Sequence, residues 1–342
     1  MRVLFVVNSH YQAYGGPYTA ISDQLYHLKK LISFKLIYKN SSTFIYNLNL
    51  TQIIKNYDVI HIYGSWTPFL VRAFFISKIL KKKTIISPIG TLEPWALKQK
   101  RFKKKIAWHL YQKAILQNTN IIHATSHIES QNLKNLGITT KIKVIPHGIN
   151  VHTNRKKNIK KKKIILFFSR IHKKKGLLEL LEAWKKLKNK KDWKLHIYGP
   201  IEDKKYFQDF LKKVKTLKLA KEVIFKGTIY GDVSKIKVFS NASAFILPSK
   251  SENFGISIGE ALALNLPVLT TTVTPWEIIN TYKAGFVFDF SIKDIQLALQ
   301  KFINLSSKEK SLMGLNAKKL IKENFLYSDI VKKYYKLYKS LN

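Results

Sequence analysis

The stretch that decides the fold of this chain is LPSKSENFGISIGEALALNLP, residues 247–267. Its pattern predicts the end of a strand, a turn, and a helix that begins near Gly255. Backbone amides at a helix start favour an anion such as a diphosphate, and a glycine lets the chain approach that ligand closely. Glu252 and Glu260 can each accept two hydroxyl hydrogen bonds, which suits a sugar or a ribose diol. On spacing alone, a capping box of Ser249 and Glu252, with Glu260 in solvent, is an equally good interpretation.

Short β-rich apolar runs alternate with helical patterns on both sides of this stretch. In the second half we expect strands at 164–168, 194–198, 223–225, 244–247, 268–270 and 286–288. In the first half we expect them at 3–7, 34–38, 59–63, 84–87, 121–124 and 143–145. Such alternation predicts parallel sheets covered by helices on both faces. The sequence therefore indicates an α/β fold of doubly wound sheets, which bind ligands at the carboxyl ends of their strands.

The chain has 342 residues, too long for one ordinary domain and comfortable for two. Residues 154–163, NRKKNIKKKK, break the alternation and offer few apolar side chains. We therefore expect domains at 1–153 and 164–325, joined by a basic linker at 154–163. A last helix is expected within 326–342, where apolar positions recur at helical spacing.

Composition narrows the class of protein. Hydrophobic residues make up 46% of the chain, which argues against global disorder. Cysteine is absent, which excludes disulfides and thiolate metal sites and fits a reducing cytoplasm. The first residues, MRVLFVVN, are expected to form a buried strand rather than a signal peptide. The most apolar run, 69–80, contains Arg72 and Lys78, so no membrane-spanning helix is expected.

The charge is unusual, with 61 Lys+Arg against 20 Asp+Glu and a formal net charge of +41. Such a field attracts nucleic acid, anionic lipid headgroups or phosphorylated substrates. The joint abundance of lysine, isoleucine and asparagine is also typical of an AT-rich genome, and the lysines would then be solvated surface. Both interpretations remain open on composition alone.

Basic and aromatic residues are interleaved around 95–108, with six positive charges in 98–105. Apolar residues recur there every four positions, at Phe102, Ile106, Leu110 and Ala114. This spacing indicates one apolar face of a helix. One interpretation is a membrane-surface patch, with lysines on lipid phosphates and Trp95, Phe102 and Trp108 at the interface. The other is a solvated loop whose aromatic side chains belong to the core.

A second candidate segment is FFSRIHKKKGLLELLEAW, residues 167–184, which predicts a strand, a basic loop and a helix. Arg170 and Lys175 would flank the mouth of the strand. Paired cations at that point can neutralise the charge that develops on a departing diphosphate. The alternative is one more lysine-rich loop in a lysine-rich chain.

The stretch SENFGISIGEALALNLPVLTT, residues 251–271, resembles the E-x(7)-E signature of glycosyltransferase family 4. Members of that family are retaining enzymes of the GT-B fold, in which two Rossmann-like domains face a cleft. The resemblance implies that Glu252 and the loop after it hold the donor sugar and that Glu260 holds the ribose. The loop residues are Asn253, Phe254 and Gly255.

Other segments agree with this resemblance. The basic loop resembles the family's G-R-x(4)-K-G motif, which implies that Arg170 and Lys175 contact the donor diphosphate, although Ser169 replaces the usual glycine. Gly199 and the segment 225–229 resemble donor-binding positions that follow two C-terminal-domain strands. Two further glycines resemble the family's glycine-rich loop facing the reaction centre, namely Gly15 and Gly16.

Residues 87–108 resemble a subset of bacterial members that make surface polysaccharides. Ile89 stands where many relatives carry histidine or arginine, so no catalytic histidine is carried over there. The chain has no D-x-D motif, no phosphate loop and no zinc spacing, so neither a metal nor a cofactor is expected. By the resemblance, the closing helix would pack back towards the N-terminal domain.

The sequence thus predicts a hexosyltransferase-type glycosyltransferase that uses a UDP- or GDP-sugar and a glycan acceptor. The resemblance implies that this acceptor is lipid-linked. We expect the N-terminal domain to bind the acceptor and the C-terminal domain to bind the donor. The expected setting is the cytoplasm, at the inner face of the cell membrane, in synthesis of O-antigen or capsule. Three alternatives are a nucleotide-sugar epimerase of the same fold, a basic nucleic-acid-binding protein, and a non-catalytic glycan or nucleotide binder.

Overall fold

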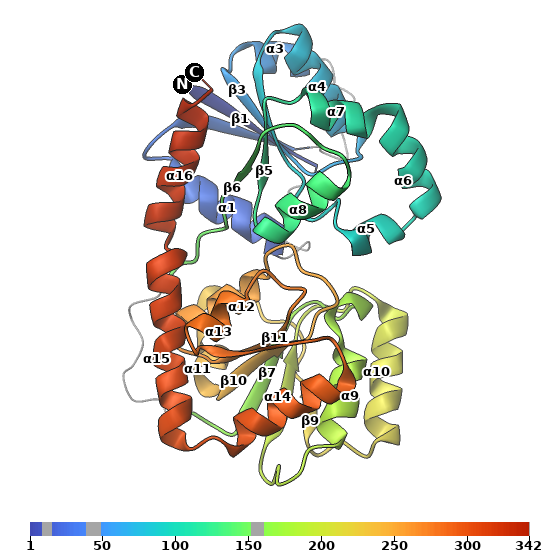
Figure 1. Ribbon diagram of the computed structural model, residues 1–342, viewed down its shortest axis with the longest axis vertical. Helices are drawn as coiled ribbons and strands as arrows, with labels where there is room; N and C mark the ends of the chain where they lie inside the picture. The colour runs from blue at the N-terminus through green and yellow to red at the C-terminus, as the bar shows by residue number, and fades with distance from the viewer. Residues whose placement is uncertain (9–15, 39–48, 152–160, 342) are drawn as a thin grey trace. The chain divides into compact units, whose positions relative to one another are not determined.

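The computed structural model describes residues 1–8, 16–38, 49–151 and 161–341. The chain forms two compact units, each with its own sheet (Figure 1). Unit 1 comprises Met1–Gly148 and Tyr327–Asn342, and unit 2 comprises Ile149–Leu326. The boundary thus falls about five residues earlier than the sequence pattern placed it. The predicted linker at 154–163 lies mostly outside the described residues.

Unit 1 contains a parallel sheet of six strands in the order β2-β1-β3-β4-β5-β6. The strands are β1 (Arg2–Val7), β2 (Ser33–Tyr38), β3 (Val59–Tyr63), β4 (Lys83–Ser87), β5 (Ile121–Ala124) and β6 (Ile142–Val144). The register aligns Val3 with Phe34 of β2 and with Val59 of β3. Alternate side chains of β1 enter different apolar clusters, because successive residues of a strand point to opposite faces of its sheet. The predicted α/β class is confirmed.

Helices cover both faces of this sheet. They are α1 (Gly16–Leu28), α3 (Leu50–Lys55), α4 (Pro68–Ile79), α5 (Pro94–Lys98), α6 (Arg101–Ala107), a π-helical turn (Trp108–Gln112), α7 (Lys113–Asn118), α8 (His127–Asn135) and α16 (Tyr327–Lys339). Within the described ranges, no helix combines the length and the hydropathy that crossing a membrane requires. The region 101–118 is helical, as the four-residue apolar spacing predicts, and is not a loop, although most of the residues from 100 to 105 are exposed to solvent.

The C-terminal helix α16 belongs to unit 1, where it packs beside α1 (Figure 1). Buried hydrogen bonds attach it to the sheet. The Tyr338 hydroxyl lies 2.9 Å from His61 Nδ1, and the Tyr334 hydroxyl lies 3.1 Å from His123 Nε2. Both imidazoles also contact the Ser87 hydroxyl, at 2.7 Å and 2.6 Å. These histidines therefore serve the structure of unit 1.

Unit 2 contains a second parallel sheet of six strands, in the order β12-β11-β10-β7-β8-β9. The strands are β7 (Ile164–Phe168), β8 (Lys194–Tyr198), β9 (Val223–Phe225), β10 (Ala244–Leu247), β11 (Val268–Thr271) and β12 (Gly285–Phe288). The helices are α9 (Leu177–Lys185), α10 (Lys204–Thr216), α11 (Asp232–Asn241), α12 (Ile256–Ala263), α13 (Ile278–Thr281), α14 (Ile292–Asn304) and α15 (Ser307–Asn324). Successive strands run outward from β7 on one side and from β10 on the other. The order of strands therefore reverses between β7 and β10, which is where doubly wound sheets bind ligands.

Acidification should destabilise unit 1 through its buried histidines. Burial lowers the pKa of His123 to about 4 and that of His147 to about 3, whereas an unfolded histidine titrates near about 6.5. Between these values the unfolded chain binds more protons, so the free energy of unfolding falls as pH falls, by up to about 1.4 kcal/mol per pH unit for each histidine. Thermal unfolding followed by circular dichroism between about pH 7 and 4 measures this slope.

The exposed His109 provides the matched control. His123→Gln should flatten the pH dependence, whereas His109→Gln should leave it as in the wild type. Equal slopes in all three proteins would show that the buried histidines are not its source.

Candidate active site

Two loops meet at the carboxyl ends of β7 and β10, which are hydrogen-bonded neighbours. The first, 169–176, leads into α9, and the second, 248–255, leads into α12. The Lys250 amide donates to the Lys174 carbonyl across 2.8 Å, which joins the two loops. Gly176 has φ +68°, and a Cβ there would lie 2.0 Å from the Pro248 carbonyl oxygen. Only glycine permits this approach, so the sequence of the first loop fixes its distance from the second.

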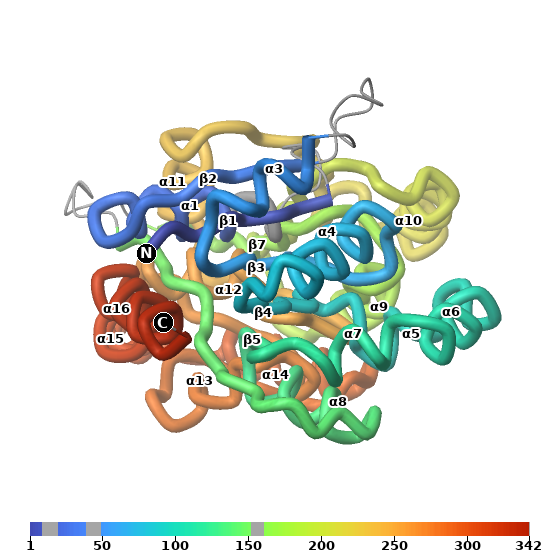
Figure 2. The backbone as a smooth tube through the Cα atoms, turned by 90° about the horizontal axis from the view of Figure 1, so that it is seen from above, coloured from blue at the N-terminus to red at the C-terminus, as the bar shows by residue number. Residues whose placement is uncertain are grey.

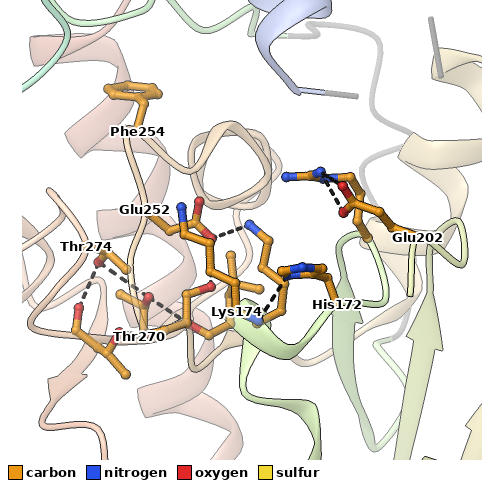
Figure 3. Close-up of polar contacts among 12 residues, drawn as sticks. His172, Lys174, Glu202, Glu252, Phe254, Thr270 and Thr274 are labelled. Carbon is orange, nitrogen blue, oxygen red and sulfur yellow. Dashed lines mark hydrogen bonds and ion pairs between the residues drawn. The ribbon is translucent and has the colours of Figure 1, made fainter. Parts of the chain in front are cut away.

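A buried ion pair joins these loops. Lys175 Nζ lies 2.5 Å from Glu252 Oε1, and each side chain is only 8% exposed (Figure 3). The Ser249 hydroxyl donates to the same carboxylate oxygen across 2.6 Å, and the Thr271 hydroxyl donates to the Ser249 carbonyl across 2.7 Å. The unit therefore places a cation and a carboxylate in a buried position where its strand order reverses.

The Glu252 carboxyl is held in its ionised form. Burial alone would raise its pKa, but the charges of Lys175 and Lys174 and the hydrogen bonds from Lys175 and Ser249 outweigh burial and lower the pKa below its usual range. The capping-box interpretation is wrong, because the Ser249 hydroxyl donates to the carboxylate and α12 begins later, after Gly255.

The start of α12 lies directly after this pair. Its N-cap is Gly255 at φ 78°, and no side chain caps it. The preceding Phe254 is buried against Trp276, whose indole nitrogen donates to the Phe254 carbonyl. The buried Asn253 Oδ1 has no hydrogen-bond partner among the described residues. This loop therefore offers uncapped amides and one unused amide oxygen, which are groups that a polar ligand can bind.

Arg170 lies at the mouth of β7, where its Nη1 contacts both carboxylate oxygens of Glu202 at 2.6 Å (Figure 3). Glu202 follows the neighbouring strand β8, and Gly199 lets that segment pass close to the first loop. A Cβ on Gly199 would lie 1.8 Å from the Ser169 carbonyl oxygen. The sequence analysis missed Glu202, although its place after a strand adjacent to β7 is the signal that could have revealed it.

Glu260 lies on α12, one turn beyond the helix start, and pairs with Lys235 of α11 across 2.6 Å. Both side chains remain about one-fifth exposed, at 21% and 20%. The carboxylate is therefore reachable from solvent. The sequence analysis did not single out Lys235, which lies in a helix without any motif.

Unit 2 thus brings Lys175 and Glu252 into contact directly before the loop from Asn253 to Gly255, and it places Arg170 on the same loop as Lys175, paired with Glu202. Of the glycines predicted in the first half, Gly16 is the first residue of α1 in unit 1, and Gly15 lies outside the described residues. No cluster of three His, Cys, Asp or Glu side chains that could hold a metal occurs in the part of the chain that the structure describes.

Comparison with known proteins gives these features a context. The family model described as glycosyl transferases group 1 matches residues 150–320, and the model described as glycosyltransferase family 4 matches residues 7–153. A Klebsiella pneumoniae protein described as an uncharacterized 41.2 kDa protein in the cps region is 27% identical over 83% of this chain and 79% of its own length. CapM of Staphylococcus aureus, a capsular polysaccharide biosynthesis glycosyltransferase, is 28% identical over 47% of this chain and 42% of its own.

Solved structures resemble the whole chain. HepE of Anabaena, in complex with UDP and glucose, has a TM-score of 0.78 at 15% identity and covers 99% of this chain and 100% of its own. WaaG, a glycosyltransferase involved in lipopolysaccharide biosynthesis, has a TM-score of 0.74 at 17% identity, and the match covers 98% of this chain and 99% of the WaaG chain. At these identities the likeness establishes the fold.

The buried ion pair generates a prediction about stability. Lys175→Met leaves the Glu252 carboxylate buried without its cation, and we expect the free energy of unfolding to fall by about 3–5 kcal/mol. The double variant Lys175→Met/Glu252→Gln removes both charges and should recover most of this loss. Urea unfolding of the four proteins in this double-mutant cycle measures the coupling. Additive losses in the double variant would contradict the assigned pairing.

Proposed function

The chain belongs to the group 1 glycosyl transferases and is a family 4 glycosyltransferase of the GT-B fold, and we propose that unit 2 binds its nucleoside-diphosphate-sugar donor. The observation that carries this proposal is the Lys175–Glu252 pair, which lies where the strand order reverses between β7 and β10, directly before the uncapped start of α12. A diphosphate requires cations and amide donors, and a sugar requires acceptors for its hydroxyls. The two loops supply both kinds of group within one short stretch.

Each charged residue receives a role in this proposal. Lys175, Arg170 and the amides at Gly255 stabilise the leaving diphosphate, where negative charge develops as the bond between the sugar's anomeric carbon and the diphosphate oxygen breaks. Glu252 accepts hydrogen bonds from sugar hydroxyls, with the Asn253 side chain beside it. Glu260 accepts the ribose hydroxyls, and Lys235 leaves the carboxylate at least in part when the ribose binds. The burial of Lys175 and Glu252 keeps water from weakening these interactions.

Transfer proceeds with retention of configuration and without a metal in this proposal. The acceptor hydroxyl forms the new bond at the anomeric carbon as the diphosphate leaves, and the leaving phosphate oxygen takes the hydroxyl proton. This route needs no protein base. It accords with the aliphatic Ile89 at a position where many relatives carry histidine or arginine.

In this proposal the donor is a UDP-sugar, and the acceptor is a lipid-linked glycan of a bacterial surface polysaccharide. HepE binds UDP and glucose, which supports the donor. CapM and the protein of the Klebsiella cps region support the pathway. The acceptor binds unit 1, and the enzyme works at the cytoplasmic face of the membrane. A donor that is converted without any acceptor would favour the epimerase instead.

Nucleotide binding tests the donor site. UDP should raise the melting temperature of the wild type more than GDP, ADP or CDP does, since a ligand at 100 times its Kd stabilises by about 2.7 kcal/mol. Glu260→Ala should reduce the shift because it removes the ribose acceptor. Arg170→Ala should bind UDP more weakly and, as its main effect, should lower kcat by about 100-fold or more, because the Arg170 charge acts on the leaving diphosphate.

Melting curves and steady-state kinetics provide these measurements. Glu277→Ala, elsewhere in unit 2, serves as the control and should behave like the wild type. If Glu260→Ala and Arg170→Ala both keep normal binding and turnover, the residues have been assigned wrongly.

Glu202 competes with the donor for Arg170. The Arg170 guanidinium is occupied by the Glu202 carboxylate, so a diphosphate must displace that carboxylate before it can bind. Glu202→Gln weakens the competitor, and we expect UDP to bind several-fold tighter, as measured by titration calorimetry. Because Asp209 also carries negative charge in unit 2 but has no contact with Arg170, Asp209→Asn controls for net charge. Weaker binding by Glu202→Gln would mean that Glu202 orients Arg170 for the donor instead of competing with it.

A further inference from the structure

An apolar stripe in unit 1 faces solvent. It consists of Phe102, Ile106 and Leu110, which are 76%, 46% and 74% exposed. Apolar residues at every fourth position of the sequence predict one face of a helix, and the structure places these three residues on α6 and the π-helical turn that continues it. The face is not a core face, since the opposite side of the turn is the buried one, with Gln112 only 2% exposed. The helix is amphipathic with its apolar side outward, which calls for a partner.

The surroundings of α6 agree with an exposed position. In Figures 1 and 2, α6 stands out from the sheet of its own unit, and it packs mainly on α5 and on the π-helical turn. The aromatic residues beside it divide between two roles. The Trp108 ring is partly buried, and its centroid lies 6.5 Å from that of Trp66. Phe102, in contrast, is 76% exposed.

Positive charge flanks the stripe on both sides. Five exposed cations surround it, namely Lys98, Lys100, Arg101, Lys103 and Lys105. The sequence from 94 to 118 contains no aspartate or glutamate. Within the described residues, none of these five cations takes part in an ion pair, whereas acidic partners neutralise Arg170, Lys175 and Lys235 in unit 2. The charge around α6 is therefore available to an external anion.

Unit 1 has a second exposed apolar pair, on α4. Phe75 and Ile79 of α4 are 48% and 79% exposed, and Arg72 and Lys78 lie on the same helix. The Lys78 ammonium donates to the Asn118 carbonyl at the end of α7 across 3.1 Å, so α4 and α7 lie side by side in unit 1. The two helical segments thus present the same combination of apolar side chains and cations.

We propose that α6 and the π-helical turn dock on an anionic lipid surface, with Phe102, Ile106 and Leu110 inserted among the acyl chains and the flanking cations on lipid phosphates. Charge complementarity selects the partner, because the segment 94–118 carries several cations and no acidic residue. The apolar stripe distinguishes a membrane from a nucleic acid, which would use the cations but leave three aliphatic and aromatic side chains in water. The inference stands on exposure and charge, independently of the proposed donor site.

Vesicle binding tests this directly. The full chain should bind vesicles of phosphatidylcholine with phosphatidylglycerol and bind pure phosphatidylcholine vesicles at least tenfold more weakly. Each cation near an anionic surface raises the binding constant about fivefold. Lys100→Gln/Lys103→Gln/Lys105→Gln should therefore weaken binding by tenfold or more. Phe102→Gln/Ile106→Gln/Leu110→Gln keeps every charge and a good helix former, and it should also weaken binding by tenfold or more.

Matched controls lie in unit 2. Lys204→Gln/Lys205→Gln/Lys212→Gln removes three exposed charges from α10, and Leu211→Gln/Val233→Gln/Leu297→Gln removes three exposed apolar side chains. Both variants should bind vesicles like the wild type. An equal loss in the α10 charge variant would overturn the proposal in favour of a general charge effect. So would unchanged binding in the apolar α6 variant, or binding to an RNA oligonucleotide that is tighter than vesicle binding and is lost only with the α6 charges.

The absence of cysteine permits a second readout that does not depend on affinity. Leu110→Cys introduces a single thiol on the stripe, and Val233→Cys introduces one in unit 2. An environment-sensitive fluorophore on residue 110 should report an apolar environment when anionic vesicles are added, and the same label on residue 233 should not. No change at residue 110 while the protein is bound to vesicles would overturn the insertion of this stripe.

Discussion

The close contact between the loops after β7 and β10 is the constraint on which the rest of unit 2 depends. Gly176 lets the first loop approach the Pro248 carbonyl of the second loop closely. The Lys175–Glu252 ion pair also joins the two loops. A buried pair of this kind gains little net stability, because removal of both charges from water offsets their attraction. In the proposed function, the pair holds two charges in defined positions in a medium of low dielectric constant, where they would stabilise a departing diphosphate.

The other charged groups of the site are held less firmly. Arg170 and Glu260 each have a partner, but both pairs are partly exposed, and water weakens them. In the proposed function, the donor diphosphate would replace Glu202 at Arg170, and the ribose would replace Lys235 at Glu260. The proposed site would then have a buried centre at Lys175 and Glu252, flanked by two partly exposed ion pairs that open when the donor binds.

The sequence predicted the strands of both sheets to within about two residues, because buried parallel strands are continuous apolar runs between helical patterns. It also placed Arg170, Lys175 and Glu252 on loops that the structure brings together, because the ends of neighbouring strands share an edge. The partners Glu202 and Lys235 were missed, since they come from elements remote in sequence and outside any motif. The apolar period of α6 was read correctly as helical, but a period cannot tell whether a face meets the core or another partner.

The central claim is that the loops 169–176 and 248–255 hold the nucleoside diphosphate. Hydrogen–deuterium exchange of the whole chain, with and without UDP, tests it most directly, because it maps protection onto the backbone without altering any residue. We expect UDP to slow exchange in both loops and in the first turn of α12, and to leave α6 unchanged. Unaltered exchange in the two loops at a saturating concentration of UDP, or protection confined to unit 1, would contradict it.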